Sequence, residues 1–214
     1  MTRFNLSAGQ WAFFIIVPIV VIAIIGVAIF FILRYRSMKK DFKYHCYKKI
    51  YKIAMDRDYY LINNFLFRID SAHVARIDHI LFADKYIYII NDFYVEGDVD
   101  GKENDASFII ISKDGKKQYM DNPMAINAKL VNKLSLITGI NQSLMIGISL
   151  INDDCRCGVQ TTSKSSYIIQ ANRFKHLVKA IESRDIGLIN KDQLASAVKA
   201  IDKLNRRKRN SGAK

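Results

Sequence analysis

Hydrophobic and polar positions divide the chain into one uninterrupted apolar segment and a longer stretch of alternating patterns. Residues 11–33 contain no charged side chain. A helix of this length measures about 35 Å at ~1.5 Å per residue, enough to cross a hydrocarbon core of ~30 Å. A cleaved signal peptide has a shorter apolar run that ends in small residues, whereas this run continues into Arg34. The pattern predicts a retained transmembrane helix at 11–33, preceded by a short extracytoplasmic N-terminus at 1–10.

The first part of the remaining chain alternates between helical and strand patterns. Between residues 38 and 54, Phe42, Cys46, Ile50 and Ile53 recur at helical spacing, which predicts a helix with one apolar face. Three runs rich in Ile, Tyr and Phe then predict strands. They are Tyr59–Ile69, Val74–Phe82 and Tyr86–Tyr94, with a tight turn at Asp84-Lys85 and an acidic loop at Glu96–Asp105.

The second part carries clear turn and cap signals. An Asp-Gly turn at Asp114-Gly115 predicts a hairpin of Ser107–Ser112 and Lys117–Met120. Asn122-Pro123 predicts the start of a helix that Gly139 ends. Two strands, Ser143–Ile151 and Ser166–Gln170, and two amphipathic helices follow. We expect a basic juxtamembrane helix at 34–52, one α/β domain at 53–205 and a basic tail at 206–214.

Basic residues are concentrated at the two ends of this soluble part. The net charge is +13, and residues 34–52 hold eight basic side chains against Asp41 alone. The first four of the eight are Arg34, Arg36, Lys39 and Lys40. Because basic flanks stay in the cytoplasm, we expect a single-pass cell-membrane protein with its N-terminus outside and its C-terminal domain inside. Anionic lipid accounts for this flank without nucleic acid.

The C-terminal tail is the other concentrated basic element. Its residues Arg206, Arg207, Lys208 and Arg209 could contact the phosphates of nucleic acid or rest on anionic lipid, and both interpretations stay open. Residues 53–202 are almost neutral, with 18 basic and 19 acidic side chains. The high isoelectric point is therefore weak evidence for DNA binding by the folded domain.

The remaining candidate chemistry is sparse. Cys46, Cys155 and Cys157 fit reduced thiols in a reducing compartment. A zinc site that combines them with His45 is disfavoured, because Cys155 and Cys157 are one residue closer than the usual pair. The sequence contains no phosphate-binding glycine loop and no nucleophile–base signature. We expect no cofactor.

Short motifs between Val74 and Asn127 carry a family resemblance. Ile77-Asp78-His79 lies on a predicted strand, Gly97-Asp98-Val99-Asp100-Gly101 follows a hairpin, and Asn122-Pro123 opens a helix. In their order and spacing they resemble the nuclease-related domain (NERD), a branch of the restriction-endonuclease-like fold. The resemblance covers roughly residues 40 to 151 and implies a mixed sheet flanked by helices.

The resemblance also implies a set of catalytic positions. In this family the strand Asp and the Glu of an E-x-K motif would hold Mg²⁺ through carboxylate oxygens, and the lysine would act on the attacking water. The four family positions fall here on Asp78, Asn91, Phe93 and Ile126, so only the Asp is kept. Asp92 is expected to face away from Asp78, because successive strand side chains point to opposite faces unless a bulge re-aims them. Lys85 and Glu96 are distant substitutes.

Three functions remain compatible with these patterns. The favoured one is a catalytically inactive binding or scaffolding module at the cytoplasmic membrane face, in which Asp78 is a strand carboxylate paired with Arg76 or His79. The first alternative is a metal-dependent nuclease that acts on DNA through a rearranged site and requires Mg²⁺. The second is a structural subunit of a membrane assembly. The expected partners are membrane lipid and a protein, with nucleic acid weakly supported.

Overall fold

The computed structural model describes residues 8–70 and 72–205 and divides the chain into two compact units, 1–42 and 43–214. Helix α1 (Ala8–Arg57) includes both the apolar segment and the expected juxtamembrane segment 34–52 in one continuous helix. It is the described helix that is long and apolar enough to cross a membrane. Pro18 lies inside it, as membrane helices tolerate.

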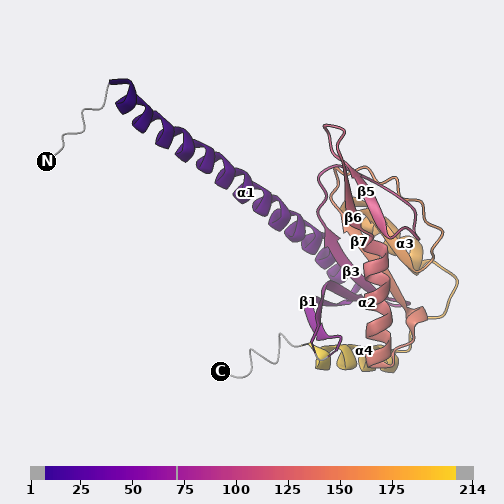
Figure 1. The fold of residues 1–214 in the computed structure, drawn as a ribbon. Helices are drawn as coiled ribbons and strands as arrows, with labels where there is room; N and C mark the ends of the chain where they lie inside the picture. Colours follow the sequence, from indigo (N-terminus) through magenta and orange to yellow (C-terminus); the bar gives the residue numbers. More distant parts are fainter. Residues whose placement is uncertain (1–7, 71, 206–214) are drawn as a thin grey trace, which may run out of the picture. The chain divides into compact units, whose positions relative to one another are not determined.

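The second unit is built on a five-stranded mixed sheet (Figure 1). Its strands are β1 (Tyr60–Arg68), β2 (Val74–Phe82), β3 (Ile87–Phe93), β7 (Met145–Ile151) and β8 (Ser166–Gln170), in the order β1-β2-β3-β7-β8. The first three are antiparallel, and β3, β7 and β8 are parallel. This arrangement confirms the expected mixed α/β sheet and each of the five predicted strands.

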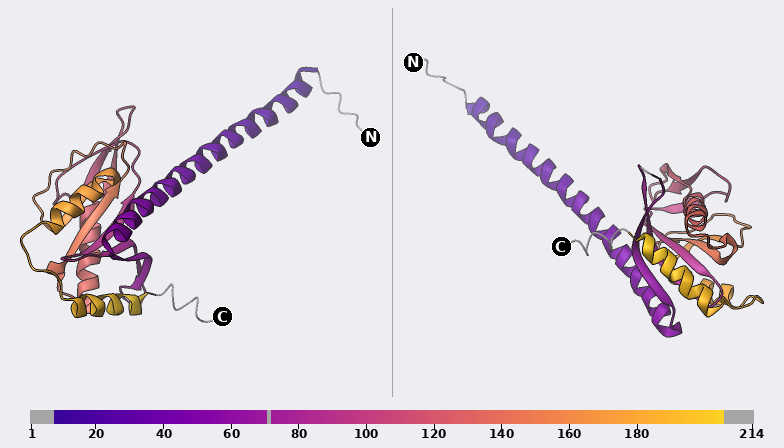
Figure 2. Two further views of the ribbon diagram at one scale, coloured as in Figure 1. Left: turned by 180° about the vertical axis from the view of Figure 1, so that it is seen from behind. Right: turned by 90° about the horizontal axis from the view of Figure 1, so that it is seen from below.

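Helices cover both faces of the sheet (Figure 2). The segment of α1 from Lys43 to Arg57 and helix α3 (Phe174–Glu182) share one face, and both line one cavity. Helices α2 (Pro123–Thr138) and α4 (Lys191–Leu204) cover the other face. Short 3₁₀ turns, η1 (Gln142–Leu144) and η2 (Ala171–Arg173), precede β7 and α3. The sheet is therefore buried on both faces, as its parallel part requires.

Helix α2 begins and ends where the sequence predicts. The Asn122 side chain accepts hydrogen bonds from the backbone N–H groups of Met124 and Ala125, and Pro123 takes the first helical position. Gly139 ends the helix in a left-handed conformation with φ 72°. Val131 and Leu134 of this helix pack in the core against Ala197 and Ile201 of α4.

A second, three-stranded sheet corrects one expectation. Residues 96–105 were expected to form a loop, but β4 (Asp98–Asp100) lies within them and pairs with β5 (Ser107–Ile111), which pairs with β6 (Lys117–Asp121). The strand is short because glycines bound it. Gly97 has φ 139°, and a Cβ there would lie 2.4 Å from the Ile111 carbonyl oxygen. The predicted Asp-Gly hairpin turn before β6 is confirmed, with Gly115 at φ 78°.

Candidate functional site

The ladder of the main sheet is interrupted around Asp78. Pairing of β1 with β2 includes His79 opposite Asn63 but omits the next position, where Asn64 adopts φ 54°. Pairing of β2 with β3 ends at His79 opposite Ile90. Asp78 therefore lies between two strands without regular pairing to either. A positive φ is costly for most residues and is tolerated best by Asn, Asp and Gly.

Side chains replace the missing ladder bonds. The backbone N–H of Asp78 donates to Asn91 Oδ1 at 2.9 Å, and the backbone N–H of Asp92 donates to Asp78 Oδ2 at 3.1 Å. The Asp78 carboxylate thus lies in the opening between β2 and β3. This opening is what brings Asp78 and the residues of β3 into one site.

Two cations hold the other oxygen of Asp78. Lys43 Nζ lies 3.0 Å and an Arg76 guanidinium nitrogen 2.9 Å from Oδ1. Burial alone would raise the pKa of Asp78, but Lys43, the Asp92 N–H and Arg76 together hold it below its usual value. The predicted pairing of Asp78 with Arg76 is confirmed. The second cation, Lys43, was not predicted as a partner and comes from α1, outside the motif region.

Asp92 forms a second, more deeply buried pair. His79 Nε2 lies 3.0 Å from Asp92 Oδ2, and His79 Nδ1 lies 2.6 Å from Asn63 Oδ1. The Asp92 side chain is 1% exposed, and its Oδ1 has no hydrogen-bond partner. Burial raises its pKa, and the hydrogen bond from His79 offsets this only in part. The thiol of Cys46, whose pKa burial and Asp92 also raise, lies beside it.

The expectation that Asp92 faces away from Asp78 is wrong. Asn91 and Asp92 do point to opposite faces of β3, as alternation requires. Asp78 does not follow the alternation, because its carboxylate enters the opening in the ladder instead of standing on one face. Asp78 and Asp92 consequently line the same cavity.

On the α2 side of β3, the polar groups are uncharged. Asn91 Nδ2 donates to Asn127 Oδ1 at 2.5 Å, and Asn127 Nδ2 donates to Ser149 Oγ at 3.0 Å. All three residues are buried. At the expected lysine position, Phe93 packs beside an apolar cluster that includes Met124. The expected Glu and Lys positions are therefore filled by an internal amide and a partly buried ring.

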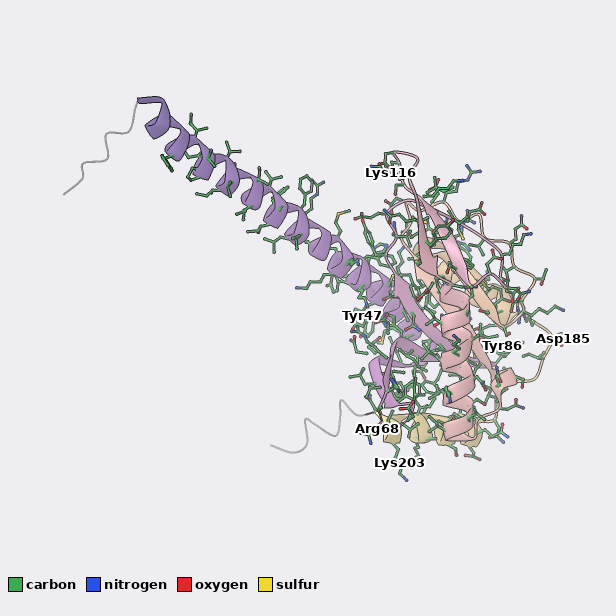
Figure 3. The ribbon with its side chains drawn as sticks, viewed as in Figure 1. Tyr47, Arg68, Tyr86, Lys116, Asp185 and Lys203 are labelled. Carbon is green, nitrogen blue, oxygen red and sulfur yellow. The ribbon has the colours of Figure 1, made fainter. Side chains whose placement is uncertain are left out.

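The cavity on the α1 side has a volume of about 420 Å³. It is lined by Lys43, Tyr44, Tyr47, Asn63, Asn64, Arg76, Asp78, His79 and Asp92. Figure 3 shows Tyr47 on the part of α1 that runs beside the strands. Neither Lys85 nor Glu96, the two distant substitutes, lines this cavity.

The donor set does not fit a resident divalent metal. Both oxygens of Asp78 are engaged, one by two cations and the other by a backbone N–H. Asp92 Oδ1 is free of hydrogen bonds but lies on an almost fully buried side chain. Within 8–70 and 72–205, no three His, Cys, Asp or Glu side chains group as metal ligands. Mg²⁺ needs several oxygen ligands, and in this arrangement Asp78 is already engaged by Lys43, Arg76 and the Asp92 N–H.

Ile126, the fourth family position, does not line this cavity. Ile126 is half-buried on α2, and the next residue, Asn127, is the one that reaches β3. Arg34, Lys39 and Lys40 are exposed on α1. The side chain of Arg36 and the tail residues Arg206, Arg207, Lys208 and Arg209 lie outside what the structure describes.

The residues proposed for zinc do not assemble. Cys46 faces Asp92, whereas His45 lies 3.3 Å from Asp153, which also accepts from Lys49 at 3.1 Å. Cys155 lies next to the β4 region, where its thiol pKa is raised to about 11 by burial. The three cysteines are free thiols.

Sequence reasoning missed Lys43, Asn63, Asn64, Asn127 and Ser149. Asn127 had a signal: it precedes the buried Val131 and Leu134 at spacings of four and seven, so an amide lies on the apolar face of α2. Lys43 likewise lies one helical turn before the buried Cys46. The partners of Asn63 and Asn64 depend on strand register, which one sequence does not specify.

Comparison with known proteins identifies a family whose match covers the region of this cavity. A model of the family described as nuclease-related domain (NERD) matches residues 43–152, just over half of the chain. The matched range contains every residue that lines the cavity. No curated protein and no solved structure matches the chain significantly.

Proposed function

The chain belongs to the nuclease-related domain family, and from this premise we propose that it is a non-catalytic binding module at the cytoplasmic face of a membrane. The single observation that carries the proposal is the double pairing of Asp78. Lys43 and Arg76, at 3.0 and 2.9 Å, stand where a hard cation would contact the carboxylate. The only family carboxylate that this chain keeps is thereby used to hold its own side chains.

The rest of the site supports the same function. Metal-dependent cleavage requires a second carboxylate that faces the metal and a group that activates water. At those positions Asn91 donates to Asn127, and Phe93 packs against apolar neighbours. An amide without charge does not replace a carboxylate as a ligand for Mg²⁺. The site instead offers exposed cations at its rim, which suit binding of an anionic ligand.

The proposed location follows from α1 and the charge around it. Its apolar segment is long enough to span a bilayer, and eight basic residues follow between positions 34 and 52. Basic flanks favour the cytoplasmic side, so the family domain lies inside and the N-terminus outside. Anionic headgroups would attract this flank by about 1 kcal/mol for each basic residue near the surface.

One observation favours a second candidate, a nuclease with a rearranged site. Asp92 and Asp78 line one cavity together with Lys43, so a second carboxylate and a lysine are present, although not at the family positions. In this candidate Asp92 replaces the missing Glu and Lys43 replaces the missing lysine. Both must leave their present partners before either can act on a metal or a water.

An activity measurement on the full chain in lipid nanodiscs separates the two candidates. Labelled single-stranded and double-stranded DNA and RNA are incubated with Mg²⁺ or Mn²⁺, and Asp78→Ala and Asp92→Asn variants serve as matched controls. The binding module predicts no cleavage beyond that of Asp78→Ala. Metal-dependent cleavage that both substitutions abolish would establish the nuclease instead. A stoichiometric protein that copurifies in detergent, without bound nucleic acid, would favour a structural subunit.

A further inference from the structure

The rim of the cavity differs chemically from its floor. Asp78, His79 and Asp92 form the buried floor, where Asp92 pairs with His79 and Asp78 pairs with Lys43 and Arg76 above it. The rim carries Lys43 and Arg76, whose side chains are 44% and 51% exposed. These two cations share a single carboxylate oxygen, so their charge is only partly neutralised. An anionic group that approaches from solvent would meet both of them first.

Aromatic side chains continue this rim along α1. Tyr44, Tyr47 and Tyr51 lie at spacings of three and four, which places them on one helical face. Neighbouring ring centroids are 6.5 and 5.7 Å apart, with interplanar angles of 28° and 34°. Tyr44 is 58% exposed and Tyr51 46% exposed. We call these three residues the tyrosine stripe.

The tyrosine stripe already binds a cation through a ring face. Lys48 Nζ lies 4.6 Å from the centroid of Tyr44. The three rings, which are exposed or half-exposed and lie in contact, form a continuous aromatic surface with Lys48 beside it. Rings of this kind stack with planar bases, and neighbouring cations bind phosphate.

The backbone at the opposite wall supports a ligand site. Asn64 holds a left-handed conformation with φ 54° at the point where pairing with β2 is omitted, and its Oδ1 accepts from Arg76 at 2.8 Å. Strained backbone of this kind is found preferentially at ligand sites. Asn63 and Asn64 bring two amides to the wall, and amides can read the polar edge of a base. The volume of about 420 Å³ suits a ligand of nucleotide size.

We propose that this cavity binds a nucleotide unit, with its phosphate between Lys43 and Arg76 and its base against the tyrosine stripe. The proposal rests on the binding function above and names its ligand. The unit can be a free nucleotide or part of an unpaired DNA or RNA strand. A duplex is excluded, because its bases stack on each other and leave no face for the tyrosines.

Binding to the full chain in neutral phosphatidylcholine nanodiscs tests this assignment. Fluorescence anisotropy is measured with a labelled 12-nucleotide single strand, the matching blunt duplex and labelled AMP, at several salt concentrations. We expect the single strand to bind at least 10-fold more tightly than the duplex. Displacement of the single strand by AMP would identify a free nucleotide as sufficient, and retention would identify the strand.

Substitutions in the tyrosine stripe and at the rim give the sharper result. Tyr44→Ala should weaken single-strand binding roughly 10-fold and Tyr44→Phe should restore it, since stacking needs the ring and not the hydroxyl. Lys43→Gln should weaken binding and reduce its salt dependence. Tyr119→Ala, at an exposed tyrosine on β6, is the matched control and should change nothing.

Several outcomes would overturn the inference. They are equal affinity for duplex and single strand, full binding by Tyr44→Ala, and displacement of the bound strand when anionic lipid replaces phosphatidylcholine, which would identify the rim as a lipid contact. Mg²⁺ is then added to the same samples to check the function on which the inference rests. Cleavage of a bound strand would reject the non-catalytic function but keep the ligand, whereas neither binding nor cleavage would reject the ligand alone.

Discussion

The two sides of strand β3 bury polar side chains with different kinds of partner. Asn91 and Asp92 are adjacent, and each places a polar side chain in the interior. On the α2 side, Asn91 joins Asn127 and Ser149 through direct hydrogen bonds between neutral groups. On the α1 side, Asp92 pairs with His79 and leaves one oxygen without a partner.

Because of this difference, we assign the α2 side of β3 to stability and the α1 side to ligand binding. A closed network of neutral groups stabilises the packing of α2 on the sheet and needs no ligand. Buried charges are weak contributors to stability, because removing them from water costs about as much as their attraction returns. Charged side chains that are nevertheless kept beside an accessible cavity, with Lys43 and Arg76 at its rim, are better explained by a ligand than by folding.

The largest effect is expected where one partner of the buried His79–Asp92 pair is removed. His79→Ala leaves Asp92 without its hydrogen-bond donor at a position that is 1% exposed. We expect the free energy of unfolding to fall by about 3–5 kcal/mol. Urea unfolding of the full chain in detergent, followed by far-ultraviolet circular dichroism, measures the change.

A double replacement is the matched control for this prediction. Replacing the pair together, by His79→Leu with Asp92→Leu, removes both polar groups and should recover a large part of the loss, as apolar replacements of buried ion pairs often do. A cost for His79→Ala that is no larger than that of an exposed substitution would show that Asp92 is not held as the structure indicates.

The neutral side of β3 should respond less strongly. Asn127→Ala removes both links of the amide network and leaves buried groups of Asn91 and Ser149 without partners. We expect a loss of about 1–3 kcal/mol in the free energy of unfolding. Lys129→Ala, at an exposed position of the same helix, is the control and should lie within about 0.5 kcal/mol of the native chain. If Asn127→Ala also abolished nucleotide binding, the separation of the two sides would be wrong.

The same comparison shows how far the sequence predicts the molecule. The strands of the main sheet and the caps of α2 were predictable, because alternation, Asn122-Pro123 and Gly139 are local signals. Strand β4 was missed, because three residues between two glycines carry too little pattern. The family match over 43–152 confirms the family resemblance, whereas the assignment of Asn91 and Phe93 to the E-x-K positions stays a prediction.

The arrangement of the site was not predictable in the same way. Alternation correctly separates Asn91 from Asp92, but it also implies that Asp78 and Asp92 face opposite sides. The interruption of the ladder at Asp78, with Asn64 at φ 54°, brings them together, and this depends on register and on backbone bonds that distant side chains replace. Lys43 was read as part of a membrane flank, because its partner lies 35 residues away.

The two carboxylates of the charged side should show opposite pH dependence. The pKa of Asp78 is below its usual value of 3.8, so its contribution to stability is present above that pH and is lost as the pH falls through its lowered pKa. The pKa of Asp92 is raised by burial, so its contribution is present below pH 3.8 and is lost as the pH rises through its raised pKa.

Substitution by Asn makes this contrast measurable. Relative to the native chain, Asp78→Asn should become more destabilising as the pH rises toward 3.8, and Asp92→Asn should become less destabilising as the pH rises above 3.8. Urea unfolding at a series of pH values from 3 to 7 records both slopes. Slopes of the same sign for the two variants would mean that His79 outweighs burial and holds the pKa of Asp92 below its usual value, as in an ordinary salt bridge.

The smallest effect on stability is expected at Lys43. Its side chain is 44% exposed, and Arg76 holds the same oxygen of Asp78 after Lys43 is removed. Lys43→Met should therefore cost less than about 1 kcal/mol in the free energy of unfolding. Lys49 lies on the other side of the buried face of α1 from Lys43 and pairs with Asp153. Lys49→Met should cost a similar amount of stability. The two variants should differ only in nucleotide affinity, which Lys43→Met lowers and Lys49→Met leaves unchanged. Equal affinities would remove the reason to treat the charged side of β3 as a binding surface, because stability alone does not distinguish these two lysines.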